Sequence, residues 1–383
     1  MRYVNLLGYV SIVAALILKF TLAESDAKAI ITFILAGIGV IPLAHLMGQA
    51  TEHLAEKTGP TWGGLLNATF GNAAELIIAI MAMYKGLNEV VKASLTGSIL
   101  GNLLLVGGAA MVAGGWNREK QRFNPKAAES NAGLLALAVA AMLFPAIFHF
   151  TAERMHDSEI VSHEHSVSIW TSIILLVVYC LGLLFTLRTH KHVFTRSPDH
   201  EVDADALQAS PGSPHGRHAG WSVKKSVMLL LIASAGIGIV AELLVGSAEQ
   251  VAHRLGWSEV FVGVILLAII GNAAEHSTAI VMARNNDMDT AMTITYQSSL
   301  QIALFATPFL VLLSAGMVAA GMGQSQHLNL VFSPMEVVAV LLSVLIVVFL
   351  GINGETNWFE GAMLLALYAI LAIAFFYIPS AAH

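Results

Sequence analysis

The sequence predicts an all-α polytopic membrane protein with about eleven transmembrane helices, one N-terminal helix followed by two inverted five-helix repeats. Three observations predict this fold: the composition, a series of long apolar stretches, and a motif that occurs twice. Of the 383 residues, 56% are hydrophobic and only 11% are charged, whereas roughly a quarter of the residues in a soluble domain are charged. The composition therefore excludes a soluble globular protein.

The apolar stretches predict the individual helices, because a helix that crosses a bilayer needs about 20 mainly apolar residues. The single cysteine, Cys180, lies inside one stretch, so an intrachain disulfide is excluded and a cysteine-based metal site is not expected. The net charge of −6 comes without a basic patch, and we expect no nucleic-acid partner. The stretches are 4–22, 28–50, 62–84, 91–115, 128–149, 167–187, 226–248, 259–283, 288–318, 335–351 and 359–379.

Positive residues predict the orientation of the bundle. Most of the 19 lysines and arginines lie at Arg2, Lys57, Arg284 or within 116–126 and 188–225, which share one side of the membrane if the helices alternate in direction. Excess Lys and Arg stay on the cytoplasmic side. We therefore expect an integral protein of the cell (inner) membrane with a cytoplasmic N-terminus and an external C-terminus.

An internal repeat defines the domain organisation. GNAAE occurs at Gly71–Glu75 and again at Gly271–Glu275, and LTGSILGNLLL (95–105) aligns with YQSSLQIALF (296–305). Because each repeat has an odd number of helices, the second enters the membrane from the opposite side, as in secondary transporters whose ion sites lie near the midplane. The predicted units are an N-terminal helix (1–27), a first repeat (28–187), a cytoplasmic linker rich in Pro, Gly, His and acid (188–225), and a second repeat (226–383).

Glu75 and Glu275 carry the functional prediction, because both lie deep within apolar stretches. An ionisable group there costs roughly 2.5–3.5 kcal/mol even on a lenient insertion scale, and it marks a functional site by default. The alternative is a protonated or hydrogen-bonded structural acid, which the repeat-equivalent positions disfavour. Two glutamates would balance the charge of a divalent cation. Gly71 and Gly271 would permit local unwinding, or only close helix packing.

Further oxygen-bearing side chains are candidate ligands around the two glutamates. Asn72 and Asn272 precede them by three residues and share their helix face. Ser98, Ser298 and Gln301 come from the next helix of each half. For the two serines, satisfaction of a backbone carbonyl within the same helix is an equal alternative.

Four polar residues are candidates for proton transfer or gating. His276 lies about 100° round the helix from Glu275, and a packed histidine is the alternative. Glu52 would line the cytoplasmic entrance. Glu249 aligns better with Glu52 in the second half, whereas Glu242 lies deeper in apolar sequence. For Glu52 and Glu249, solvation at the interface is the alternative.

The segments TEHLAEKTGPTWGGLLNATFGNAAELIIAI, GNAAEHSTAI and SSLQIALFATPFLVL resemble the Ca2+/H+ antiporters of the cation/Ca2+ exchanger superfamily, over nearly the whole chain from about residue 28. The resemblance implies alternating access by movement of the helices that open each repeat. It also implies that Glu75 and Glu275 are central Ca2+ ligands and proton carriers, surrounded by Asn72, Asn272, Ser98, Ser298 and Gln301. One departure is Gln297, preceded by Tyr296, where the family usually has Gly.

The sequence therefore predicts a secondary active antiporter that exchanges Ca2+ or a related divalent cation for H+, with the bilayer as its surroundings. We expect no enzymatic activity and no cofactor besides the transported ions. A Na+/Ca2+ or monovalent cation/H+ exchanger is the main alternative. A cation channel is less favoured, because an inverted repeat indicates a site opened from one side at a time. An intramembrane enzyme would need a motif such as HExxH or GxSxG, which the sequence lacks. A homo-oligomer is compatible with the sequence.

Overall fold

The structure is a computed structural model that describes residues 2–21, 25–58, 60–155, 163–190, 221–322 and 327–378. The central part of the predicted linker, 191–220, lies outside these residues. The first half contains α1 (Arg2–Thr21), α2 (Asp26–Thr58), α3 (Pro60–Phe70), α4 (Ala73–Tyr84), α5 (Asn88–Leu100), the π-helical turn η1 (Gly101–Val106), α6 (Gly107–Gly115), β1 (Gln121–Arg122), α7 (Pro125–Met155), α9 (Glu164–Leu184) and η2 (Phe185–Thr189). The second half contains α11 (Val223–Leu255), α12 (Glu259–Phe261), η5 (Val262–Leu267), α13 (Ala268–Arg284), α14 (Met288–Gln301), η6 (Ile302–Ala306), α15 (Thr307–Ala319), α16 (Pro334–Gly351), β2 (Glu355–Thr356) and α17 (Trp358–Phe376).

The all-α membrane architecture is confirmed. Among the described residues, 9 helical segments are long and apolar enough to cross a membrane, and the shorter apolar helices Asn5–Thr21 and Ala73–Tyr84 accompany them. Every one of the predicted apolar stretches contains helix. The total of eleven spanning segments stays a prediction.

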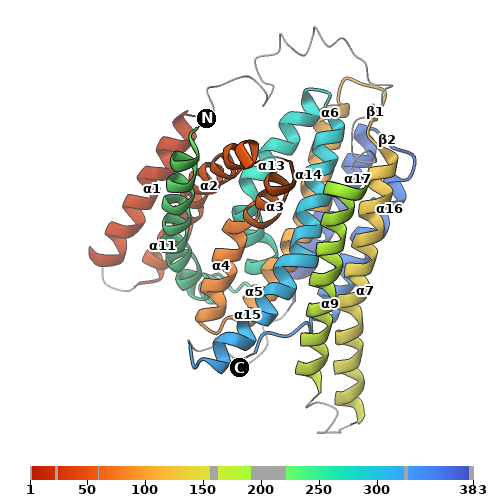
Figure 1. Ribbon diagram of the computed structural model, residues 1–383. Helices are drawn as coiled ribbons and strands as arrows, with labels where there is room; N and C mark the ends of the chain where they lie inside the picture. Colours follow the sequence, from red (N-terminus) through yellow and green to blue (C-terminus); the bar gives the residue numbers. More distant parts are fainter. Residues whose placement is uncertain are drawn as a thin grey trace.

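The two ends of the bundle differ in structure. At one end β1 and β2 pair antiparallel, with Gln121 opposite Thr356. The hydrogen bond from Lys120 to Glu355 and the neighbouring Arg122 guanidinium lower the pKa of the Glu355 carboxyl group. In Figure 1 this ribbon and the N-terminus lie at the top, and the C-terminus lies at the bottom. We call the two ends the ribbon end and the opposite end.

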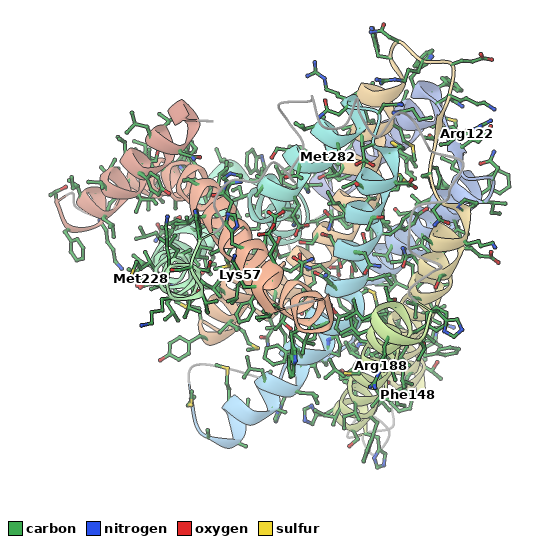
Figure 2. The ribbon with its side chains drawn as sticks, turned by 45° about the horizontal axis from the view of Figure 1, so that its top comes forward. Lys57, Arg122, Phe148, Arg188, Met228 and Met282 are labelled. Atoms are coloured by element: carbon green, nitrogen blue, oxygen red, sulfur yellow. The ribbon has the colours of Figure 1, made fainter. Side chains whose placement is uncertain are left out.

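Positive side chains gather at the ribbon end. Lys57 is in the last turn of α2, Arg122 belongs to β1 and Arg188 lies in η2, and all three are seen from this end in Figure 2. Arg118 donates a hydrogen bond to the carbonyl oxygen of Arg284 over 3.2 Å. Of the positions that the sequence analysis assigned to one side of the membrane, these five therefore lie at one end of the molecule.

Helices α1, α2 and α11 form a layer beside the remaining helices, at the left of Figure 1. Asp26 at the start of α2 pairs with Arg254 near the end of α11, with 3.1 Å between Oδ2 and Nε. His53 near the end of α2 packs on Trp221, which precedes α11, with 4.7 Å between ring centroids. The helices that open the two halves thus pack antiparallel, as two repeats of opposite orientation require.

Helical irregularities lie in the middle of the bundle. The predicted helix 62–84 is broken at Gly71 and Asn72, whereas α13 runs through Gly271 without a break. The predicted helices 91–115 and 288–318 each contain a π-helical turn, η1 and η6, at repeat-equivalent positions. Such wide turns frequently occur at functional sites.

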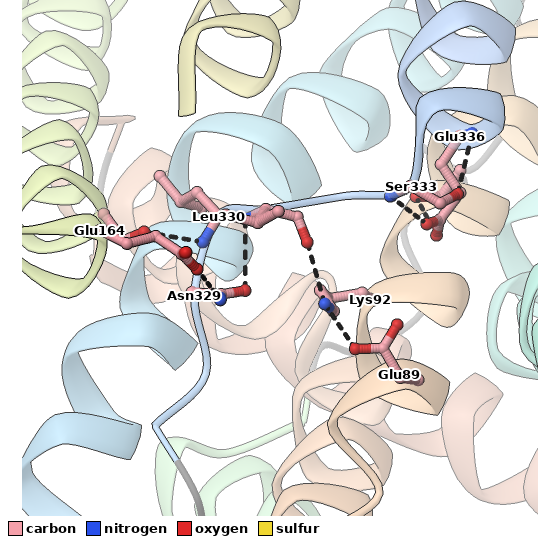
Figure 3. A network of polar contacts seen from close by, with 10 residues as sticks. Glu89, Lys92, Glu164, Asn329, Leu330, Ser333 and Glu336 are labelled. Carbon is pink, nitrogen blue, oxygen red and sulfur yellow. Dashed lines mark hydrogen bonds and ion pairs between the residues drawn. The ribbon is translucent and has the colours of Figure 1, made fainter. Parts of the chain in front are cut away.

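A buried segment, 327–333, crosses the opposite end of the bundle between α15 and α16, and we call it the strap. Leu328, Leu330 and Phe332 of the strap are each 1% exposed. The backbone N–H of Leu328 donates to Ser314 Oγ of α15 over 2.7 Å, and that of Leu330 donates to Ser168 Oγ of α9 over 3.1 Å. The strap therefore fixes these helices to one another (Figure 3).

Candidate cation site

Four helices bring the candidate ligands to the middle of the bundle, α4 and α5 from the first half and α13 and α14 from the second. Since α4 begins after the break, Asn72 occupies its N-cap position and Glu75 lies in its first turn. The N-terminus of a helix favours negative charge. Asn272 and Glu275 lie within α13. The sequence therefore places equivalent residues in two different local structures.

Each motif glycine lies against a polar side chain of the other half. A Cβ atom built on Gly271 would lie 3.4 Å from Cγ of Glu75, and one built on Gly71 would lie 3.3 Å from Oε1 of Gln301. A residue without a side chain permits this approach. Of the two predicted roles of the glycines, close packing holds at both positions and local unwinding only at Gly71.

Amide side chains connect the two halves. Asn72 Nδ2 donates to Gln301 Oε1 over 3.0 Å, and Asn272 Nδ2 donates to Ser98 Oγ over 3.0 Å. Asn102 Nδ2 donates to Asn272 Oδ1 over 3.4 Å. All five side chains are buried. Asn102 comes one helical turn after Ser98 in the sequence and therefore belongs to the same polar face of this helix.

The two glutamates face the same region. Glu75 is 9% exposed and lies against Gly271, one turn before Glu275 on α13. Its Oε1 atom lies 3.9 Å from the position of a Cβ on Gly271, so the Glu75 carboxyl group faces the helix that carries Glu275. Ser298 Oγ donates a hydrogen bond to Glu275 Oε2, so this hydroxyl serves the site rather than its own helix. Ser98 Oγ accepts a hydrogen bond from Asn272 of the other half.

The donor set suits a hard cation. The groups that converge here are carboxylates, amides and hydroxyls, and Ca2+ takes six to eight oxygen ligands of these kinds. The buried Oδ1 atom of Asn72 has no hydrogen-bond partner in the part of the chain that the structure describes. An unsatisfied buried acceptor costs roughly 1–3 kcal/mol, and a cation bound between Glu75 and Glu275 would satisfy it. The same carboxyl groups can instead take up protons.

His276 packs beside the site on another face of α13. It is 9% exposed, and its Cε1 atom lies 4.0 Å from a Cβ built on Gly101 at the start of η1. Its buried Nε2 atom has no hydrogen-bond partner among the described residues. No hydrogen bond joins it to Glu75 or Glu275 there, and its role in proton transfer stays a prediction.

The other three gating candidates lie outside the site. Glu242 on α11 pairs with Lys19 of α1, with 2.8 Å between Nζ and Oε1, and its carbonyl oxygen accepts a hydrogen bond from Lys85 Nζ over 3.2 Å. Glu52 on α2 and Glu249 on α11 are exposed. The structure therefore places Glu242 at a contact between the α1, α2, α11 layer and the end of α4. The entrance role of Glu52 and Glu249 stays a prediction.

Comparisons with known proteins agree with this fold. Residues 28–188 and 225–377 match the family of sodium/calcium exchanger proteins. The chain is 43% identical over 353 residues to the Ca(2+)/H(+) antiporter of Synechocystis sp., covering 91% of each protein. It is 41% identical over 340 residues to the Ca(2+)/H(+) antiporter ChaA of Bacillus subtilis, covering 88% of this chain and 90% of that protein.

Solved structures show the same architecture. The structure of native YfkE matches with a TM-score of 0.78 at 35% sequence identity, covering 98% of this chain and 100% of that chain. The crystal structure of the H+/Ca2+ exchanger CAX shares the fold, with a TM-score of 0.66 at 15% identity and coverage of 98% and 91%. Together with the paired GNAAE motifs at the centre of the bundle, these likenesses lead to one conclusion. The chain belongs to the sodium/calcium exchanger protein family.

Proposed function

We propose that this protein is a secondary active antiporter that exchanges Ca2+ for H+ across a membrane, and not an enzyme. The observation that carries the proposal is the meeting of Glu75 and Glu275, from repeat-equivalent positions, within a set of oxygen donors. The relatives at 41–43% identity that bear the name Ca(2+)/H(+) antiporter support the choice of ions.

In this proposal the two carboxylates share the cation and neutralise its charge. Asn72 contributes its free Oδ1 atom, while its Nδ2 atom is held by Gln301. Ser298 fixes one oxygen of Glu275. Hydrogen bonds connect Asn272 of the second half to Ser98 and Asn102 of the first half. These bonds hold α13 in place against α5 and η1.

Exchange follows from competition for the same oxygens. A carboxylate binds a cation only when it is ionised, so protons and Ca2+ exclude each other at this site. Two ionised carboxylates without a cation would be a costly state within the hydrocarbon region. The site therefore switches from one side of the membrane to the other only when Ca2+ or protons are bound to it.

Alternating access requires the α1, α2, α11 layer to move against the other helices. Helices α2 and α11 are in contact at both ends, through Asp26 with Arg254 at one end and His53 on Trp221 at the other, so they can move together. Lys85, at the end of α4, reaches the backbone of α11 at Glu242. This contact would have to break when the opposite end opens. The geometry thus supports rocking of one layer around a fixed site, as in other transporters built from inverted repeats.

We further propose that the ribbon end faces the cytoplasm of a bacterial-type cell and that the protein resides in the plasma membrane. The positive segments that contain Lys57, Arg118, Arg122 and Arg188 gather at this end, and excess positive charge stays inside. The bacterial relatives support the choice of membrane.

The proposal is tested by uptake of radiolabelled Ca2+ into liposomes that contain the purified protein. A proton gradient, acidic inside, should concentrate Ca2+ inside the liposomes, and Ca2+ loading should release protons from them. Dissipation of the gradient with a protonophore should stop the uptake. If a Na+ gradient drives uptake fully while a proton gradient does not, the proposed H+ exchange is wrong and the Na+/Ca2+ alternative replaces it.

A further inference from the structure

The repeat relation extends beyond the exchange site to the two ends of the bundle. With the offset that aligns Ser98 with Ser298, Glu89 corresponds to Asp289, and Lys92 corresponds to Met292. The starts of α7 and α16 are aligned by a second motif, in which Phe123-Asn124-Pro125 corresponds to Phe332-Ser333-Pro334. In this alignment Ala127 corresponds to Glu336. At the opposite end, α5 of the first half meets the start of α16 of the second half. At the ribbon end, α14 of the second half meets the start of α7 of the first half.

At the opposite end this place holds a buried ammonium group (Figure 3). Lys92 is 8% exposed, and its Nζ lies 2.6 Å from Glu89 Oε1 and 2.9 Å from the carbonyl oxygen of Val331 in the strap. Glu336 is buried beside it and accepts a hydrogen bond from Thr96 Oγ1 over 3.1 Å. A cation belonging to the chain thus joins α5 to the strap, and Thr96 joins α5 to Glu336 of α16.

At the ribbon end the equivalent place is a cavity of about 20 Å³, and roughly 10–15 Å³ suffices for one water-sized guest. At the positions that correspond to Glu336 and Lys92, the cavity is lined by the shorter Ala127 and by the uncharged Met292. The acidic residue is retained as Asp289. The cavity is lined by Phe123, Asn124, Ala127, Ala128, Asn131, Asp289, Met292, Thr293 and Tyr296.

Two polar groups at the cavity bear on its content: Asp289 is partly exposed, and Tyr296 is buried. Asp289 Oδ1 accepts a hydrogen bond from the backbone N–H of Asn124 over 2.5 Å, but no lysine or arginine of the described residues pairs with this carboxylate. Tyr296 is 1% exposed, and within the described part of the chain its hydroxyl has no hydrogen-bond partner. The repeat-equivalent Glu89, by contrast, has the Lys92 ammonium beside it.

We propose that this cavity at the ribbon end binds one small monovalent cation, Na+ in the first place, beside Asp289, where the other half carries the Lys92 ammonium. Oxygen atoms of Asp289, Tyr296 and Thr293 provide hard donors for such an ion. A single carboxylate balances one positive charge and not two, and the volume admits one ion of water-like size. The site is distinct from the exchange site between Glu75 and Glu275.

The bound cation would link α14 to α7, as Lys92 links α5 to the strap. Gln297 Nε2 already donates to Asn131 Oδ1 of α7 over 3.2 Å, and Ser298 on the next position holds Glu275. The cation therefore stabilises the helix that presents Ser298 without contacting the transported ion. Its binding should be visible as stabilisation of the folded protein, independent of transport.

The test is thermal unfolding of the purified full chain in detergent, with NaCl compared with choline chloride at equal ionic strength. The native protein should unfold at a temperature higher by about 1–2 °C in NaCl. Asp289→Asn keeps the acceptor for the Asn124 amide but removes the charge, and it should abolish the Na+-dependent rise. Met292→Lys supplies the ammonium of the other half, and it should unfold at the higher temperature in either salt.

Glu89→Gln at the opposite end is the matched control and should keep the Na+-dependent rise. Tyr296→Phe, which removes only one hydroxyl oxygen, should raise the NaCl concentration needed for half the shift several-fold. Equal unfolding temperatures in NaCl and choline chloride for the native protein would mean that the cavity binds water only, which overturns the proposal. A full rise in Asp289→Asn overturns it as well. Either result leaves the proposed Ca2+/H+ exchange untouched, because no readout depends on transport.

Discussion

Glu75 of α4 lies directly against Gly271 of α13, with its Cγ atom 3.4 Å from the position that a Cβ on this glycine would occupy. The carboxyl group of the first half is therefore held over the backbone of the second half, one turn before Glu275. Neither half can form the site alone. The consequences of this arrangement are testable by substitution.

Glu75→Gln and Glu275→Gln should each abolish proton-driven Ca2+ accumulation, because each removes one of the two charges that neutralise the cation. Uptake into proteoliposomes should fall at least about 100-fold, in line with a loss of 3 kcal/mol or more on removal of one partner of a buried charged pair. Glu56→Gln, at an exposed acid on α2, is the control and should transport normally. Concentrative uptake by either site variant would refute a two-carboxylate site.

Ser298→Ala should weaken the apparent Ca2+ affinity by about 10-fold, because a hydrogen bond to a charged group contributes about 1.5–3 kcal/mol. The lost hydroxyl stabilises the ionised carboxylate of Glu275, which is the form that binds the cation. Ser299→Ala is the matched control, since Ser299 Oγ donates to the carbonyl oxygen of Thr295. The measurement is uptake rate against free Ca2+ concentration. Equal affinities in the two variants would contradict the assigned role.

Gly71→Ala should reduce transport about 10-fold or more while the protein still inserts and elutes as a single species. An added Cβ would lie 2.6 Å from the carbonyl oxygen of Asn67 and 3.3 Å from Gln301 Oε1, so both the break and the Asn72 bond to Gln301 would shift. Gly238→Ala, where no heavy atom lies within 4 Å, serves as control. Normal transport by the Gly71 variant would show that the break is not required.

Gly97→Ala should destabilise the fold itself. A Cβ on Gly97 would collide with the backbone of Val264 in η5, and overpacking of a tight contact costs about 1–3 kcal/mol or more. Gly316→Ala, on α15 with open space around it, should leave the unfolding temperature in detergent unchanged or higher, because Ala favours helix. Similar unfolding temperatures for the two variants would show that α5 and η5 can separate at no cost.

Single cysteines should report the orientation. With the exposed Cys180 replaced by Ser, Glu119→Cys near the ribbon should react with an impermeant thiol reagent from the cytoplasmic side only. Tyr377→Cys, which follows α17 at the opposite end and is 77% exposed in the native chain, should react from the outside only. Labelling of both from the same side would overturn the proposed topology.

The sequence predicted the helices and the central residues for physical reasons that act locally. Long apolar stretches must form helices in a bilayer, since only there are all backbone hydrogen bonds satisfied. Glu75 and Glu275 stood out because a carboxyl group in such a stretch is costly. Asn72, Asn272, Ser98, Ser298 and Gln301 followed from helix periodicity and from the repeat.

The remaining features depend on contacts between distant parts of the chain. Glu242 lies in apolar sequence, yet the structure ties it to Lys19 at an exposed contact between α11 and α1. The bond of Gln297 to Asn131 likewise joins α14 to α7. No local pattern shows which helix will lie opposite such a residue. The end regions behave in the same way, since the cavity beside Asp289 and the Lys92 network occupy equivalent places with different side chains.

The pentapeptide GNAAE takes two conformations in one molecule, broken after Phe70 in the first half and continuous through Gly271 in the second. Because the local sequence is the same, neither shape is dictated by it, and the surrounding helices select one or the other. Each half therefore displays a conformation available to its counterpart. If the two halves exchanged shapes, the ribbon end and the opposite end would exchange places in the access cycle. The two conformations of GNAAE thus outline the two states that the proposed alternating access requires.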